Sequence, residues 1–248
     1  MLNEQWQDRF VWRGEDGKGY FASISVEFFL KDLPNMTIGP EIFNTDKLEK
    51  FTDFYDVVDR LAVIYELWCK KNKRNLPPFA GSKLQNHFKG CMGELFFTEF
   101  INANKKLVLE CSDGKKKLFT FGEVKPRPDD CPYKGDYGVD MVSEVTVDGK
   151  TWPCVFQAKM WNPYSPEIMT YDIMSNTYTD GVRNGLINPM DNGNIFLCWT
   201  GLKQYVSPWL WTSPIGDCVT LIGQEDVDFN RRDVPKFFRY FFDFLGNV

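Results

Sequence analysis

Apolar and polar positions first follow a clear helical period in residues 46–71. Hydrophobic side chains recur there at spacings of three and four, which is typical of an amphipathic helix. Asp46 with Glu49 three positions later forms a capping-box pattern at its start. The Asn-Leu-Pro-Pro run at 75–78 ends the pattern, because proline cannot continue a helix. We therefore predict a boundary near residue 80, between an N-terminal α+β extension (1–80) and a core (81–248).

A second helix is predicted over residues 83–102. Ser82 and Gln85 form its capping box, and apolar side chains again recur at helical spacing. Gly90 and Gly93 interrupt this pattern. Glycine inside a helix costs about 1 kcal/mol relative to alanine, so the two glycines indicate either close approach by another group or tight packing of the helix.

The remaining pattern alternates strands with helices. A strand pair is expected over residues 9–13 and 20–30, where the run FASISVEFFL is rich in β-formers. Further strands are expected over residues 106–111, 118–121, 194–200 and 218–222, and helices over 167–184 and 235–245. From residue 81 onward this order predicts an α/β core with a mixed central sheet flanked by helices.

The stretch from Gly135 to Trp161 reads as a β-hairpin whose turn lies at Val147-Asp148-Gly149-Lys150. Side chains alternate along a strand, so the second strand has two different faces. Cys154, Phe156, Ala158 and Met160 form an apolar face, and Val155, Gln157 and Lys159 form the other. Pairing through the turn would bring Asp140 on the first strand close to Gln157 and Lys159. A carboxylate, an amide oxygen and a lysine at one sheet end indicate a divalent-cation site with a charge-stabilising lysine. The competing interpretation is an ordinary solvated sheet face.

Composition limits the class of protein. The chain has 248 residues, of which 43% are hydrophobic and 22 are phenylalanine, enough for a thick core. No apolar run approaches the roughly 20 residues of a membrane span, and the N-terminal stretch lacks the regions of a signal peptide. A cytoplasmic protein without a membrane partner is therefore expected.

Several kinds of chemistry are disfavoured by the residues present. Seven scattered cysteines without a CxxC pair, and a single histidine, His87, argue against structural zinc and for buried reduced thiols. The chain has no GxSxG, P-loop or Rossmann glycine pattern. The net charge of −5 argues against a simple basic coat for nucleic acid. Residues 81–135, with 10 basic and 7 acidic side chains, are positively charged on balance.

A helix that carries Glu94 is followed by a strand with Val139-Asp140, a strand with Gln157-Ala158-Lys159, a helix and a further strand. This order of elements and residues resembles the PD-(D/E)XK nucleases. Glutamine in place of the usual acid resembles the QxK variant of Mrr-like and some type II restriction endonucleases. The resemblance covers about residues 83–230, and it implies a restriction-endonuclease-like core. Val139 departs from the family's proline at a position that is not a ligand.

The resemblance also implies roles for individual residues. Asp140, the side-chain oxygen of Gln157 and the carbonyl of Ala158 would bind Mg²⁺, with Mn²⁺ as a possible substitute. Glu94 would bind through water or hold a second ion, and Glu99 is its rival. Lys159 would position or help to deprotonate the attacking water and stabilise the pentacovalent phosphate.

We therefore expect a metal-dependent endonuclease acting on DNA in restriction, defence or repair, with RNA as an open alternative. Cutting both strands of a duplex favours a homodimer or a higher homo-oligomer. Candidate nucleic-acid contacts are Lys89, Lys115, Lys116, Lys134 and Lys203. The alternatives are a nuclease-like fold that has lost catalysis and binds nucleic acid or protein, and a carbohydrate or interaction surface built on aromatic side chains. Trp209 and Trp211, in a predicted exposed loop, best support the latter.

Overall fold

The computed structural model describes residues 12–13, 19–20, 24–37, 49–72, 82–128, 130–132, 138–164, 168–188, 194–227 and 229. The helices are α1 (Ile24–Asp32), α2 (Phe51–Asn72), α3 (Ser82–Ala103), α4 (Tyr171–Arg183) and α5 (Pro208–Thr212), with 3-10 turns η2 (Leu33–Asn35), η5 (Gly216–Cys218) and η6 (Gln224–Asp226). The strands are β1 (Trp12–Arg13), β2 (Gly19–Tyr20), β3 (Lys106–Glu110), β4 (Lys116–Phe121), β5 (Lys125–Pro126), β6 (Met141–Val147), β7 (Lys150–Lys159), β8 (Asn194–Trp199) and β9 (Val219–Ile222).

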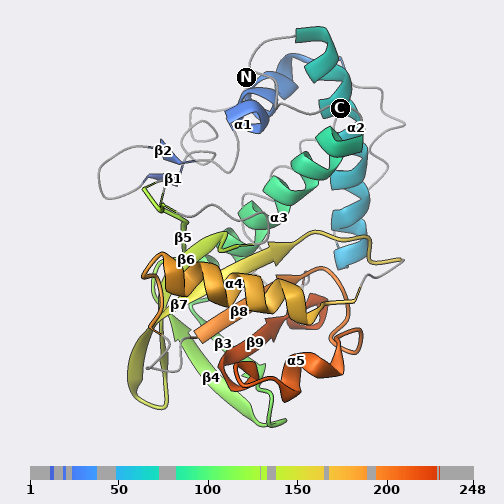
Figure 1. The fold of residues 1–248 in the computed structure, drawn as a ribbon. Helices are drawn as coiled ribbons and strands as arrows, with labels where there is room; N and C mark the ends of the chain where they lie inside the picture. Colours follow the sequence, from blue (N-terminus) through green and yellow to red (C-terminus); the bar gives the residue numbers. More distant parts are fainter. Residues whose placement is uncertain are drawn as a thin grey trace.

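Within the described residues, a mixed sheet of seven strands forms the centre of the fold (Figure 1). Its order is β3-β4-β6-β7-β8-β9, and β5 pairs with β6. The first strands, up to the β6–β7 pair, are antiparallel, whereas β8 and β9 run parallel to β7. Parallel neighbours need a crossover, and α4 supplies it between β7 and β8. The predicted α/β class with a mixed sheet flanked by helices is confirmed.

Helices cover both faces of the sheet, so residues 154–158 of β7 are buried on both sides. The apolar face predicted from the alternation, with Cys154, Phe156, Ala158 and Met160, packs into one core together with α1, α2 and α3. Val155 on the opposite face packs into a second core with α4 and α5. Figure 1 shows α4 in front of β7 and β8. Only about 2% of Gln157 is exposed. The competing interpretation, an ordinary solvated sheet face, is therefore wrong for Gln157, because α4 packs on this side of β7.

The N-terminal segment differs from its prediction. Residues 24–30, expected to belong to a strand, lie in helix α1 (Ile24–Asp32). Val26, Phe29, Leu30 and Leu33 are buried, and their spacing of three, four and seven places them on one helical face. In the described residues, strand β2 (Gly19–Tyr20) pairs with Trp12–Arg13 of β1. The β propensity of these residues is outweighed by the burial of an apolar stripe, which α1 packs against α2.

Helix α1 docks through specific contacts with the helices that follow it. The ring of Phe29 packs against Tyr65 and Phe88 with centroid distances of 5.3 and 5.5 Å. The hydroxyls of Ser25 and Tyr65 share a hydrogen bond of 2.8 Å. The described part of the N-terminal extension thus shares one hydrophobic core with the sheet. The proposed division near residue 80 stays a prediction, and residues 73–81 lie outside the described residues.

The helix predicted over 46–71 is confirmed and begins at Phe51. Its first turn is capped from within, because the Asp53 carboxylate accepts hydrogen bonds from the backbone N–H groups of Glu49 (3.1 Å) and Lys50 (2.8 Å). The predicted cap, Asp46, lies outside the described residues.

The other predicted elements of the core are confirmed, with small shifts at their ends. These are the helix over 83–102, the strands near 106–111, 118–121, 194–200 and 218–222, and the helix after 167, which begins at Tyr171. The helix predicted over 235–245 lies outside the described residues. No helix in the described ranges is both long enough and apolar enough to cross a membrane.

Candidate functional site

The β6–β7 hairpin sets the register of the candidate site. Asp148 and Gly149 form its two-residue turn, and both have positive φ angles, 51° and 76°. This is the backbone conformation that an Asp-Gly hairpin turn requires. From the turn the ladder runs through seven residue pairs to Met141 opposite Phe156. Asp140 therefore stands just beyond the ladder, opposite Gln157, as the sequence predicted.

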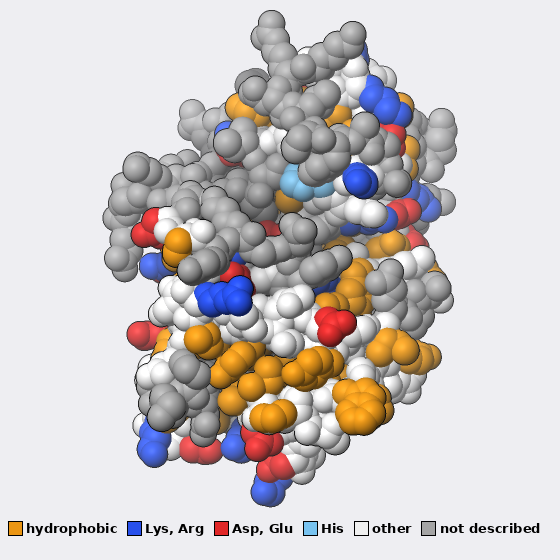
Figure 2. All heavy atoms as spheres, viewed as in Figure 1, with side chains coloured by type: hydrophobic (Ala, Val, Ile, Leu, Met, Phe, Trp, Pro, Cys, Tyr) orange, Lys and Arg blue, Asp and Glu red, His pale blue; other side chains and the backbone are white. Residues whose placement is uncertain are grey.

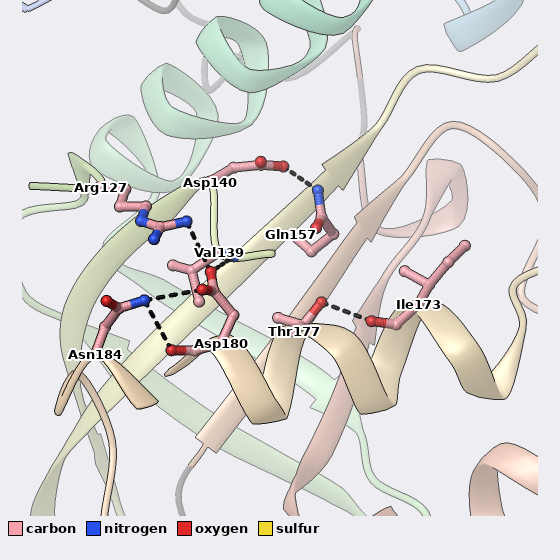
Figure 3. Close-up of polar contacts among 8 residues, drawn as sticks. All are labelled: Arg127, Val139, Asp140, Gln157, Ile173, Thr177, Asp180 and Asn184. Carbon is pink, nitrogen blue, oxygen red and sulfur yellow. Dashed lines mark hydrogen bonds and ion pairs between the residues drawn. The ribbon is translucent and has the colours of Figure 1, made fainter. Parts of the chain in front are cut away.

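Asp140 is held by two donors from β7. The side-chain amide Nε2 of Gln157 donates a hydrogen bond to its Oδ2 (Figure 3). The backbone N–H of Ala158 donates another to the same oxygen at 2.7 Å. The backbone N–H of Asp140 itself donates to the carbonyl of Phe156 at 2.8 Å. The predicted association of Asp140 with the Gln157-Ala158 segment is thus present in the fold.

Glu94 and Lys159 lie within electrostatic range of Asp140. Burial raises the pKa of Asp140 to about 6, while the Lys159 ammonium, the Ala158 N–H and Arg127 act to lower it. Burial also raises the pKa of Glu94 well above its usual range, with the charge of Asp140 acting in the same direction and Lys159 opposing it. Two partly buried carboxylates and one ammonium are therefore gathered at this end of β7, and the carboxylates disfavour each other's ionisation.

Close packing between α3 and the end of β7 brings Glu94 to this position. A Cβ atom added to Gly93 would lie 2.9 Å from Cβ of Met160, closer than such atoms approach in proteins. Glu94 and Lys159 are the chain neighbours of these two residues. Gly90, by contrast, has open space where its Cβ would stand. The interpretation of Gly93 as a close-approach position is confirmed, and its partner is a core methionine.

A buried acid on α4, which the sequence analysis did not single out, lies beside this site. The Asp180 carboxylate accepts hydrogen bonds from Nη1 of Arg127 (2.8 Å), the backbone N–H of Val139 (2.7 Å) and Nδ2 of Asn184 (2.8 Å) (Figure 3). It shares one face of α4 with Ile173 and Thr177, at spacings of four and three. A charged residue on the buried stripe of that helix was the signal available in the sequence.

The oxygen atoms at the site suit a hard divalent cation. Oε1 of Gln157 is buried and has no hydrogen-bond partner, which is rare for an amide oxygen inside a protein. Mg²⁺ prefers such oxygen ligands together with carboxylates. A cation would also offset the repulsion between Asp140 and Glu94. The described residues contain no cluster of three or more histidine, cysteine, aspartate or glutamate side chains placed to hold a metal.

Three of the candidate nucleic-acid lysines are engaged in ion pairs. Lys89 is mostly buried and pairs with Asp59 (2.9 Å), and Lys203 pairs with Asp226 (2.7 Å). Lys115 is exposed and pairs with Asp113 in the β3–β4 turn (3.0 Å). Lys116 is exposed at the start of β4, and Lys134 lies outside the described residues. The proposed contacts with nucleic acid stay predictions, and the pairing of Lys89 leaves it the least suited to a phosphate.

The predicted tryptophan loop is a short helix, α5. Trp209 is 74% exposed, as expected, but Trp211 is partly buried and packs against the second core. Tyr171, the first residue of α4, and Tyr205, shortly before α5, are also exposed. Figure 2 shows hydrophobic side chains gathered over the lower half of this face of the molecule.

Comparison of the chain with protein-family models, with curated proteins and with solved structures gave no match.

Proposed function

We propose that this protein is a magnesium-dependent nuclease that hydrolyses DNA phosphodiester bonds. The observation that carries the proposal is the convergence of Asp140, Gln157, Lys159 and Glu94 at one end of β7. Glu94 lies on α3, Asp140 immediately precedes β6, and the other two residues are among the last three of β7. Such a combination of carboxylates, amide and ammonium suits charge stabilisation during transfer of a phosphoryl group.

The order of elements around these residues also supports the proposal. Helix α3 bears Glu94, the antiparallel strands β4, β6 and β7 follow, and α4 leads to β8, which runs parallel to β7. This is the order in which the PD-(D/E)XK resemblance placed its motif residues. The restriction-endonuclease-like fold is accordingly part of the proposal.

Each residue then has a definite task. Asp140, Oε1 of Gln157, the Ala158 carbonyl and Glu94 would hold Mg²⁺, or Mn²⁺ in its place. The bound cation would supply a Lewis acid for a phosphate oxygen and an activated water. Lys159, partly buried beside two carboxylates, would place its ammonium against the charge that develops on the phosphorus oxygens. Asp140 has to be ionised to act as a ligand, which its raised pKa opposes until a cation is present.

The decisive experiment is a cleavage assay in Mg²⁺ on plasmid, linear and methylated DNA, with a structured RNA as a further substrate. Asp140→Ala and Lys159→Ala should each reduce cleavage by about 10²- to 10³-fold while the fold is retained. Lys150→Ala is the matched control, because Lys150 lies at the exposed far end of the same strand. It should cleave like the wild-type protein.

Full activity in either site variant would refute the assignment of the site. Absence of cleavage on every substrate, together with no effect of Mg²⁺ or Mn²⁺ on the melting temperature, would instead favour the alternative of a binding module without catalysis. Cleavage of RNA alone would retain the site and change the substrate. Sedimentation of the protein with and without a duplex would test the homodimer that double-strand cleavage favours.

A further inference from the structure

Two residues distant in the sequence hold the backbone on both sides of the Asp140 carboxylate. Ahead of it, the backbone N–H of Val139 donates to the Asp180 carboxylate at 2.7 Å. Behind it, the carbonyl of Asp140 accepts a hydrogen bond from the backbone N–H of Arg127 at 2.9 Å. Arg127 and Asp180 are in turn joined by an ion pair of 2.8 Å. The peptide unit before Val139 and the peptide unit after Asp140 are therefore both fixed to one connected pair.

Gly138, the residue before Val139, lies in close contact with Asp180. A Cβ atom at Gly138 would clash with the Asp180 carboxylate, its Cγ lying 2.7 Å away, and would come within 3.3 Å of Nη1 of Arg127. Only glycine leaves room for the carboxylate to reach the N–H of Val139. The sequence Gly-Val-Asp is thus matched in shape to the acid on α4.

The stability of the fold does not explain this arrangement well. The side chains of Asp180 and Arg127 are only 7% and 14% exposed, and Nε and Nη2 of Arg127 are buried without hydrogen-bond partners. A buried ion pair recovers its desolvation cost only when its remaining donors are satisfied. The pair is therefore a weak source of stability, and what it does achieve is to hold one backbone segment in place.

We propose that Asp180, together with Arg127, is the positioning element of the site: it fixes the backbone at Val139 and Asp140 so that the Asp140 carboxylate faces Ala158 and Gln157. The importance of this position for metal binding rests on the proposed function. The position of the carboxylate itself does not, and it can be measured without metal or substrate.

The backbone N–H of Ala158 is the reporter, because it donates to Oδ2 of Asp140 at 2.7 Å. Amide hydrogen exchange of the full-length, metal-free protein, resolved by residue, should show this N–H protected in the wild type. In Asp180→Ala it should exchange about tenfold faster or more, since a hydrogen bond to a charged group is lost. Gly138→Ala disturbs the same contact from the other side and should have the same effect. Asp172→Asn, an exposed acid in the first turn of α4, is the matched control and should change nothing.

The second measurement is Mn²⁺ affinity by calorimetry on the same variants. Asp180→Ala and Gly138→Ala should weaken it by about 10- to 100-fold, as for residues that orient metal ligands. Unchanged protection of Ala158 in both variants overturns the proposal, even if the protein is a nuclease. If the wild type binds no Mn²⁺ and cuts no nucleic acid, the proposed function fails, and the exchange of Ala158 still decides the positioning role. If Asp180→Ala does not fold, Asp180→Asn and Gly138→Ala give the same readout.

Discussion

The side-chain amide of Gln157 donates a hydrogen bond to the carboxylate of Asp140, although the two residues lie on opposite strands of a hairpin. The contact uses Nε2 and leaves Oε1 buried without a partner. An amide at this position holds the carboxylate in place by a hydrogen bond and adds no negative charge. In the metal-free protein, Asp140 and Glu94 are therefore not exposed to the repulsion of a third carboxylate.

Replacing Gln157 by glutamate should destabilise the metal-free protein and strengthen its binding of Mg²⁺. Gln157→Glu places a third carboxylate beside Asp140 and Glu94, so we expect the metal-free protein to lose about 1–3 kcal/mol of unfolding free energy. Mg²⁺ should restore most of the loss and bind more tightly than to the wild type. Urea unfolding with and without Mg²⁺ measures both effects, with Gln157→Met as the control that removes the amide without adding charge. An equal loss in the presence and absence of Mg²⁺ would contradict the prediction.

Neutralising Asp140 should stabilise the metal-free protein. Burial raises the pKa of Asp140 to about 6, so the folded state binds more protons than the unfolded state between about pH 4 and 6. The wild type therefore loses stability as the pH rises through this window. Asp140→Asn should be more stable by up to about 3 kcal/mol above pH 6, and the difference should vanish near pH 4.

The same variant should lose the response to Mg²⁺. Thermal unfolding from pH 4 to 8, with and without Mg²⁺, tests both statements. If the difference in stability between the wild type and Asp140→Asn does not change with pH, burial does not raise the pKa of Asp140.

Two glycines on α3 should respond in opposite ways to the same substitution. Gly93→Ala introduces a Cβ atom 2.9 Å from Cβ of Met160, and we expect a loss of about 1–3 kcal/mol. Gly90→Ala meets no atom within 4 Å and should gain about 0.5–1 kcal/mol from helix propensity. Urea unfolding of the two variants measures both values. Gly93→Ala should also lower cleavage, because it pushes Glu94 away from Lys159, whereas stabilisation by both changes would show that α3 and β7 are not in close contact.

His87 should affect acid stability without affecting catalysis. It is the single histidine of the chain, and burial lowers its pKa below the usual 6.5. The folded state therefore disfavours its protonated form, and the stability that depends on His87 is lost as the pH falls below about 6.5. His87→Gln should lose less stability than the wild type between pH 7.5 and 5.5 and should keep full cleavage activity. Urea unfolding at the two pH values provides the comparison, and a marked loss of cleavage would assign His87 a role that its place on α3 does not indicate.

Residue patterns predicted the central hairpin because its signals are local. The Asp-Gly turn fixes the register, and the register alone places Asp140 opposite Gln157. Helix α3 and the strands on either side of the hairpin followed from apolar spacing in the same way. These features depend on residues close in the sequence, where propensity and periodicity act directly.

The features that were missed depend on partners distant in the sequence. Residues 24–32 carry β-forming side chains, and docking of Phe29 on Tyr65 and Phe88 selects the helix. The ion pair between Lys89 and Asp59 of α2 was not predicted either. Asp180 contacts Val139 across 41 positions, and no local pattern connects the two. Packing of this kind overrides propensity and can be seen only in the assembled fold.

The two-residue turn of the β6–β7 hairpin has a consequence for the order of folding. A short turn closes with little loss of chain entropy, so Asp140 and Gln157 can meet as soon as residues 140–159 pair. Glu94 and Asp180 reach the same place only after α3 and α4 have docked from distant parts of the chain. The hairpin can thus form before α3 and α4 dock on it, and at the proposed metal site tight binding of a divalent cation would require the complete fold.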